Sequence, residues 1–223
     1  MKRSEINTLQ AKAVEFFKKH SFYLPPWAYW CREDWIRNAD AVSEIVESKL
    51  GWDLTDFGLG DFYKTGLLLF TIRNGKADDP QGKNYAEKIM IVREEQITPW
   101  HFHWNKTEDI INRGGGHLVI ELANATGDGN LAHTPVSVST DGIHQTVDAG
   151  GKLILKPGES ITLPPYLYHT FYGEKETGTV LVGEVSKVND DDTDNRFLEP
   201  VGRFPEIEAD ESVLFYLCNE YPV

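Results

Sequence analysis

Apolar residues recur at helical spacing near the N-terminus. They predict a helix over residues 4–20: Ile6, Leu9, Ala13, Phe16 and Phe17. Ser4 is placed to cap this helix, and His20 at its end is expected at the surface or as a cap. A second helix is predicted over residues 39–50, with Gly51 just past its end. We expect both helices to belong to an N-terminal extension, residues 1–60, that packs on the main body.

From Gly66 the pattern changes to short apolar runs separated by glycine and proline turns. These runs predict strands in residues 66–73 (before an Asn74-Gly75 turn), 85–94, 116–124 and 179–188. They also predict a hairpin around Asp141-Gly142 in residues 136–150, two short apolar runs around a Pro157-Gly158 turn in residues 152–165, and one more strand in residues 212–223. Seven or more short strands indicate a closed barrel or a two-sheet sandwich. No alternation of strand and helix supports a doubly wound sheet. We therefore expect an all-β core over residues 61–223, within a single domain overall.

The segment of residues 98–116 carries the candidate chemistry. His101 and His103 are two positions apart, so in a strand both imidazoles point to one face. Glu108 follows after enough chain to turn and begin a neighbouring strand. Two imidazoles and a carboxylate on one side of a sheet form a divalent-metal site, and His169 is the best candidate for a fourth ligand. A pair of histidines alone is more often structural, and it is the other two residues that favour the metal site.

The segment that contains His169 follows two prolines. Pro164 and Pro165 interrupt a short strand, and strand character resumes before His169. Prolines are confined to sheet edges and to strand ends, so this segment is expected at a sheet edge or at a barrel mouth. A ligand-bearing residue would lie in such a place.

Charge and composition narrow the possible partners. The formal net charge of -13 argues against nucleic acid and against anionic membrane surfaces, because binding to both depends on clustered cations. Two distant cysteines imply no disulfide framework, and no apolar run approaches a membrane span or a signal-peptide core. A reducing cytoplasm is therefore the expected compartment.

The two candidate segments resemble the two cupin motifs. The first has His-x-His, four residues, Glu108 and then Gly114, and the second runs from Gly158 through a proline-rich turn to His169. Pro164-Pro165-Tyr166 departs from the Pro-x-Gly that cupins often have. The resemblance implies a double-stranded β-barrel, or jelly roll. It also implies His101, His103, Glu108 and His169 as its metal ligands.

A denser similarity covers nearly the whole chain. The segments YAEKIM, HFHW, KTEDIINRGGG, LPPYLYHTF, VLVGEVSKVNDDDTDNRFL and LCNEY together resemble the bacterial D-lyxose isomerases. This resemblance implies interconversion of D-lyxose and D-xylulose, and of D-mannose and D-fructose. It implies Mn²⁺ as the usual metal, with Co²⁺, Fe²⁺ or Zn²⁺ as alternatives. Because cupins often pair through sheet edges and N-terminal arms, we expect a homodimer.

Isomerisation also needs a base and groups that stabilise an enediol. Glu184 in the last long strand is the candidate base, and it shares a face with Val182 and Ser186. Lys88 and Lys106 are the candidate cations for a sugar oxygen or an enediolate. Asp192 and Asp194 are candidates for binding distal hydroxyls; their acidic run lacks the glycine and glutamate of a calcium loop. Each of these side chains has an ordinary structural or surface role as its alternative.

Three other functions stay open at the level of sequence. A cupin dioxygenase would use iron with the same ligands, and a sugar-binding barrel would perform no chemistry. An isomerase of phosphorylated sugars would need a cationic pocket, for which Arg73, Arg93 and Arg113 are available. A hydride shift without a base also stays open.

Overall fold

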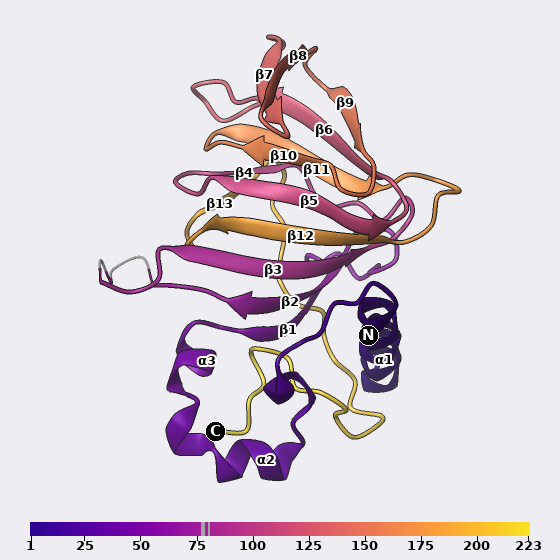
Figure 1. Ribbon diagram of the computed structural model, residues 1–223, viewed down its shortest axis with the longest axis vertical. Helices are drawn as coiled ribbons and strands as arrows, with labels where there is room; N and C mark the ends of the chain where they lie inside the picture. The colour runs from indigo at the N-terminus through magenta and orange to yellow at the C-terminus, as the bar shows by residue number, and fades with distance from the viewer. Residues whose placement is uncertain (77–78, 80) are drawn as a thin grey trace.

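Two antiparallel sheets face each other in the computed structural model, which describes residues 1–76, 79 and 81–223 (Figure 1). In the described residues the larger sheet contains, in spatial order, β1 (Gly51–Thr55), β2 (Leu67–Arg73), β3 (Tyr85–Val92), β12 (Val180–Lys187), β5 (Glu108–Gly115), β10 (Ser160–Leu163), β7 (Val136–Thr140) and β8 (Ile143–Val147). The smaller sheet contains β13 (Asn195–Phe197), β4 (His101–His103), β11 (Leu167–Gly173), β6 (Leu118–Asn124) and β9 (Gly151–Leu155). The predicted all-β, cupin-like core is confirmed.

The main core fills the space between the two sheets. The larger sheet contributes Leu69, Met90 and Ile110, and the smaller sheet contributes Ile120 and Phe171 to the same cluster of buried side chains. Strand alternation places every second residue of each strand in this space. Polar residues on the same inner faces are therefore forced into the interior, which is where the candidate site lies.

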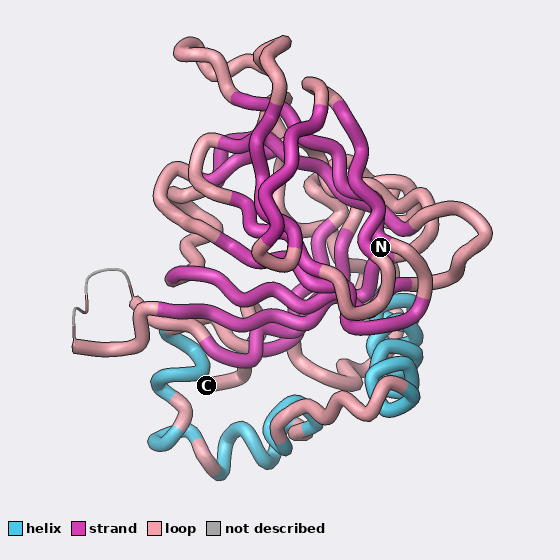
Figure 2. The backbone as a smooth tube through the Cα atoms, turned by 45° about the horizontal axis from the view of Figure 1, so that its top comes forward, coloured by secondary structure: helices cyan, strands magenta, loops and turns pink. Residues whose placement is uncertain are grey.

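The helical extension covers the outer face of the larger sheet. It comprises α1 (Arg3–Lys19), η1 (Pro26–Tyr29), α2 (Arg32–Arg37), η2 (Ala39–Ala41) and α3 (Ser43–Glu47), which gather at one end of the molecule in Figures 1 and 2. Leu9 and Phe17 of α1 belong to one buried cluster with Phe70 and Ile89 of the sheet. Because helices cover this outer face, strand β3 is apolar on both faces from Ile89 to Val92, and of its two charged residues, Glu87 and Lys88, Lys88 faces inward.

Two details of the predicted helices are wrong. The first helix begins at Arg3 with Lys2 as its cap, and Ser4 lies in the first turn, where Asp210 accepts hydrogen bonds from its amide and its hydroxyl. The second helix, expected over residues 39–50, is reduced to η2 and α3, and α2 precedes it. Tertiary contacts override the local apolar stripe here, because the chain must turn to start β1 at Gly51.

The strands match the sequence pattern closely, apart from one turn and one C-terminal strand. The hairpin at Asp141-Gly142 is confirmed, since both residues have the positive φ of such turns. The Asn74-Gly75 turn is wrong: β2 and β3 are joined by residues 74–84, and Asn74 is buried. The C-terminal strand is also wrong, since that segment makes a single bridge from Leu217 to Trp52.

The boundaries of the extension stay a prediction, although β1 lies within residues 1–60 and pairs with β2. The cysteines, Cys31 and Cys218, are both free thiols, as expected. None of the described helices combines the length and the apolar character that crossing a bilayer requires.

Candidate functional site

Three histidines meet on the inner face of the smaller sheet. His101 and His103 lie at the two ends of β4, and His101 is paired in register with His169 of β11. Phe102, between them, points outward into a cluster with Tyr168. The shared face that alternation predicts for the two histidines is confirmed.

The predicted sheet edge at His169 is wrong. Pro164 and Pro165 lie in the connection between β10 and β11, and β11 is an inner strand of its sheet.

Backbone carbonyls orient two of these imidazoles. Nδ1 of His101 lies 2.8 Å from the oxygen of Pro99, and Nδ1 of His169 lies 3.0 Å from the oxygen of Leu167. A neutral imidazole that donates from Nδ1 to a carbonyl presents Nε2 as a lone-pair donor. The three histidines bring one nitrogen each to within 4.8 Å of one another.

Glu108 reaches the histidines from the opposite sheet. It opens β5, which belongs to the larger sheet, so the expectation of a strand neighbouring the histidine strand is wrong. Its Oε1 lies 3.1 Å from Nε2 of His169 and 3.3 Å from Nε2 of His103. The carboxylate and the imidazoles therefore meet across the barrel interior.

Electrostatics keep His101, His103 and Glu108 in the protonation states that bind metals. Burial, together with the neighbouring imidazoles His169 and His103, lowers the pKa of His101 well below its ordinary value. Burial likewise lowers the pKa of His103. Burial alone would raise the pKa of Glu108, but the charges of Lys106 and His103 outweigh it and hold that pKa well below its usual range. Neutral imidazole and carboxylate are the ligating forms.

The buried nitrogens of the site fit a divalent cation. Both ring nitrogens of His103 and Nε2 of His169 are buried and make no hydrogen bond among the described residues, although the two Nε2 atoms are close to the carboxylate of Glu108. An unpaired buried polar atom costs free energy, which coordination of a cation would offset. Imidazole nitrogens together with a carboxylate are a donor set for borderline transition metals.

Next to the histidines, two lysines surround Glu184. Lys88 and Glu184 are register partners across β3 and β12, so their side chains share the inner face. Nζ of Lys106 lies 2.9 Å from Oε1 of Glu184 and 2.8 Å from Oε2 of Glu108. Nζ of Lys88 lies 3.6 Å from Oε2 of Glu184. All the side chains of this cluster are buried, and Ser186 adds a hydrogen bond of 3.0 Å to Oε1 of Glu184.

The two predicted aspartates have different surroundings. The carboxylate of Asp194 is buried and accepts hydrogen bonds from the backbone amides of Asn105 and Lys106, so it fixes the loop between β4 and β5. Asp192 is exposed and pairs with Lys49. The described residues that line the site cavity include Asp192 but not Asp194.

The cavity itself has a volume of about 470 Å³, within the usual range of small-molecule pockets. Its lining joins His101 and His103, the lysines and both glutamates to apolar residues, among them Phe57 and Phe197, whereas His169 lies behind this lining and is 1% exposed. The ring of Phe197 stacks on His101, with 5.4 Å between the ring centroids. A lining that combines charged and aromatic side chains is suited to a small hydroxylated ligand.

Sequence reasoning missed two charged residues in this lining. Asp191 is held at its carboxylate by Arg203, 3.0 Å away, and by Lys88, 3.8 Å away. Burial alone would raise the pKa of Asp191, but Lys88, Arg203 and Lys106 outweigh it and lower that pKa. The sequence does show the acidic run of residues 190–194 and, a few positions later, Arg203. It could not show that these two segments meet in the folded protein.

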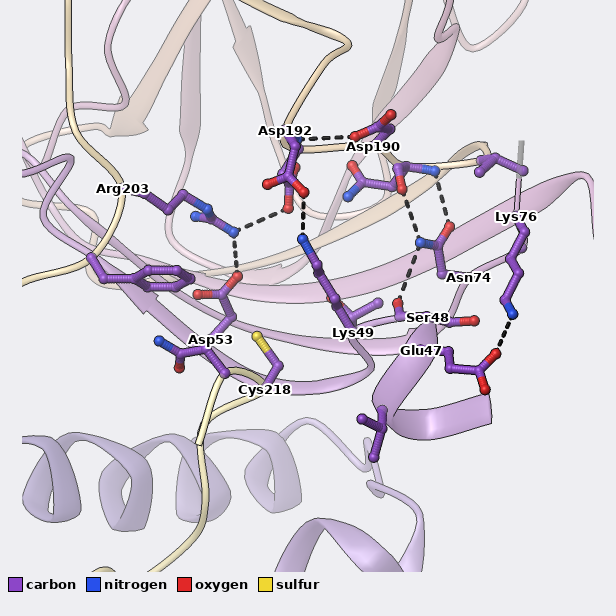
Figure 3. Close-up of a pocket in the computed structure, with 18 residues that line it drawn as sticks. Glu47, Ser48, Lys49, Asp53, Asn74, Lys76, Asp190, Asp192, Arg203 and Cys218 are labelled. Atoms are coloured by element: carbon purple, nitrogen blue, oxygen red, sulfur yellow. Dashed lines mark hydrogen bonds and ion pairs between the residues drawn. The ribbon is translucent and has the colours of Figure 1, made fainter. Parts of the chain in front are cut away.

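A second cavity, of about 510 Å³, adjoins the first and is also lined by Asp191, Asp192 and Arg203 (Figure 3). Figure 3 shows Arg203 extending to Asp53 of β1, with Lys49 reaching toward Asp192. The helical extension and β1 thus contribute to the surroundings of the site, which the sequence did not indicate.

Comparison with known proteins identifies the family. The D-lyxose isomerase family model matches residues 1–221. The chain belongs to the D-lyxose isomerase family. It is 52% identical over 223 residues to the D-lyxose/D-mannose isomerase of Serratia proteamaculans, covering 99% of this chain and 98% of that one. The enzyme of the same name from Escherichia coli O157:H7 is also 52% identical, with the same coverage.

Solved structures share the fold of this D-lyxose isomerase family member at low sequence identity. The L-ribose isomerase of Cellulomonas parahominis without ligand has a TM-score of 0.64 at 15% identity, over 93% of this chain and 98% of that chain. The enzyme of Acinetobacter sp. DL28, as a mutant bound to L-ribose, has a TM-score of 0.61 at 14% identity, with the same coverage. At this identity the likeness establishes the fold alone.

Proposed function

We propose that this protein is a metal-dependent aldose–ketose isomerase that interconverts D-lyxose and D-xylulose, and D-mannose and D-fructose. The observation that carries the proposal is the meeting of two groups of residues in one cavity: His101 and His103 with Glu108, and Glu184 with its lysines. His169 adjoins the first group, with its Nε2 3.1 Å from Oε1 of Glu108. The names of the relatives at 52% identity support the choice of sugars.

The cation would be held by His101, His103, Glu108 and His169. Nitrogen and oxygen donors suit Mn²⁺, and Co²⁺, Fe²⁺ and Zn²⁺ are alternatives for the same ligands. A divalent cation bound there supplies a Lewis acid for the oxygens on C1 and C2 of the open-chain sugar. The buried, unpaired ring nitrogens of His103 and His169 support this assignment.

Glu184 would move the proton between the two carbons. Glu184 lines the cavity. Its Oε1 already accepts hydrogen bonds from Lys106 and Ser186, while Oε2 is 3.6 Å from Nζ of Lys88. We assign Oε2 as the atom that takes the proton from C2 and returns it to C1, through a cis-enediol.

The cavity favours free sugars over phosphorylated ones. Among the described residues, Arg73, Arg93 and Arg113 do not line it, and Arg203 is engaged by Asp53 and Asp191. A phosphate placed there would face Asp191 and Asp192 without an unpaired guanidinium to receive it. We therefore expect turnover of D-mannose and none of its 6-phosphate.

The test is a sugar panel scored for ketose formation with purified protein, before and after removal of metal by a chelator. We expect conversion of D-lyxose that is lost on chelation and restored by Mn(II). Sugar binding without a ketose in the metal-replete protein would eliminate the isomerase. Oxygen uptake with a substrate would favour the dioxygenase, and complete retention of the C2 hydrogen in deuterated water would favour a hydride shift. Light scattering tests the expected homodimer.

A further inference from the structure

One side-chain amide oxygen accepts hydrogen bonds from both lysines of the site. Oδ1 of Asn189 lies 2.6 Å from Nζ of Lys88 and 3.2 Å from Nζ of Lys106. Because an ammonium group only donates, both bonds require the oxygen of the amide, and its nitrogen is left to face the other way. Asn189 therefore connects the two lysines, which lie 101 and 83 positions away from it in sequence.

A second asparagine fixes the backbone of Asn189. Nδ2 of Asn74 donates to the carbonyl of Asn189, and Oδ1 of Asn74 accepts from the amide of Asn189, both at 2.9 Å. Asn74 also donates to the carbonyl of Ser48, at 3.4 Å, and Figure 3 shows it between Ser48 and the acidic loop. Asn74 is buried, so this reciprocal pair is shielded from competition by water.

The two lysines differ in how many of their donors are engaged. Lys106 directs its three N–H groups to Glu108, Glu184 and Asn189, at 2.8, 2.9 and 3.2 Å. Among the described residues Lys88 makes one short hydrogen bond, to Asn189, while its carboxylate neighbours Glu184 and Asp191 are 3.6 and 3.8 Å away. Lys88 thus keeps donors for a ligand in the cavity, and Lys106 does not.

We propose that Asn189, held by Asn74, is a positioning residue that gives the two lysines separate tasks. It locks Lys106 as a bridge between the carboxylates of Glu108 and Glu184. It holds Lys88 beside Oε2 of Glu184, with donors directed to a sugar oxygen. This inference rests on the proposed function and assigns Lys88 as the lysine that contacts substrate.

The kinetic test compares Asn189→Ala and Asn189→Asp with Asn124→Ala, each loaded with Mn(II). Asn124 is the control, since its side chain also takes part in two hydrogen bonds, here donated to Thr134 and Pro135, but it ends β6 and does not line the cavity. For Asn189→Ala we expect kcat on D-lyxose to fall at least about tenfold, with KM and Mn(II) retention within about twofold of wild type. Asn189→Asp keeps an oxygen acceptor and should recover part of kcat. A kcat equal to that of Asn124→Ala, or one that falls only in step with lost metal, would overturn the proposal.

A second measurement does not depend on turnover. Heteronuclear NMR of the lysine ammonium groups in metal-free protein should show two protected signals, assigned with Lys88→Met and Lys106→Met. In Asn189→Ala and in Asn74→Ala we expect the Lys88 signal to lose protection, while Asn124→Ala leaves it unchanged. Unchanged protection of Lys88 in both variants would overturn the positioning role, even for a protein that isomerises D-lyxose. A wild type that fails to turn over any sugar would instead reject the proposed function.

Discussion

Lys106 and Glu108 form an ion pair with 2.8 Å between Nζ and Oε2, and both side chains are 3% exposed. The pair stands where the chain crosses from the smaller sheet to the larger one, at the first residue of β5. Glu108 turns its other oxygen to the histidines, so the lysine compensates the buried charge on the side away from the candidate metal site. Burial of a carboxylate at this position therefore depends on Lys106.

Replacing Lys106 by methionine should destabilise the metal-free protein by about 3–5 kcal/mol, because two buried carboxylates lose their cation. Chemical denaturation measures this difference. Lys152→Met is the control, since Lys152 pairs with Glu121 at the surface, where solvent screens the pair, and its loss should change the free energy of unfolding far less. Equal effects of the two substitutions would show that the buried cluster is not held together by Lys106.

Glu108→Gln should lower Mn(II) retention and isomerase activity together, because a neutral amide replaces an anionic ligand and weakens its pairing with Lys106. Metal content after gel filtration and turnover of D-lyxose are the two measurements. Excess Mn(II) should restore part of the activity. Full metal retention with lost turnover would instead place Glu108 outside the ligand set.

Glu184→Gln should reduce kcat by at least about 100-fold, the usual contribution of a general base, while metal retention is unchanged. The amide keeps the shape and a hydrogen-bond acceptor for Lys106 but cannot accept the proton from C2. Turnover and exchange of the C2 hydrogen with solvent are measured in parallel. An unchanged rate would mean that Glu184 is not the base.

The inward placement of several candidate site residues could be predicted from sequence, because these residues follow strand alternation. His101 and His103 share a face through their spacing alone, and Glu184 follows Val182 to the inner face in the same way. The inward lysine in β3 was visible as a charge in an apolar run. These features depend on a period of two residues, which the sequence carries directly.

The remaining parts of the site depend on contacts between distant segments. Arg203 meets Asp53 across 150 positions of sequence, and Asn74 meets Asn189 across 115. No local pattern encodes such pairs. The sequence also could not show that β4 and β5 belong to opposite sheets, because the loop between them has the length of an ordinary hairpin connection.

Asp194→Ala should lower the free energy of unfolding by about 2 kcal/mol and weaken metal retention, while KM for D-lyxose changes little. The carboxylate accepts hydrogen bonds from the backbone amides of Asn105 and Lys106, which would be left without a partner in the loop that positions Glu108. Thermal unfolding, metal content and KM are measured together. A raised KM at unchanged stability would support a substrate-binding role for Asp194.

Asp191→Asn should destabilise the protein at pH 5, and this effect should shrink as the pH falls below about 3.8, the ordinary pKa of an aspartate. Lys88, Arg203 and Lys106 outweigh burial and lower the pKa of Asp191 in the folded state. Below the ordinary pKa the unfolded state then binds more protons than the folded state, so wild-type stability declines as the pH falls toward the folded-state pKa. The variant lacks this contribution, so its unfolding free energy should depend less on pH between 5 and 3. Denaturation of both proteins across that interval is the measurement, and parallel curves would show that Asp191 contributes no net stabilisation through its cations.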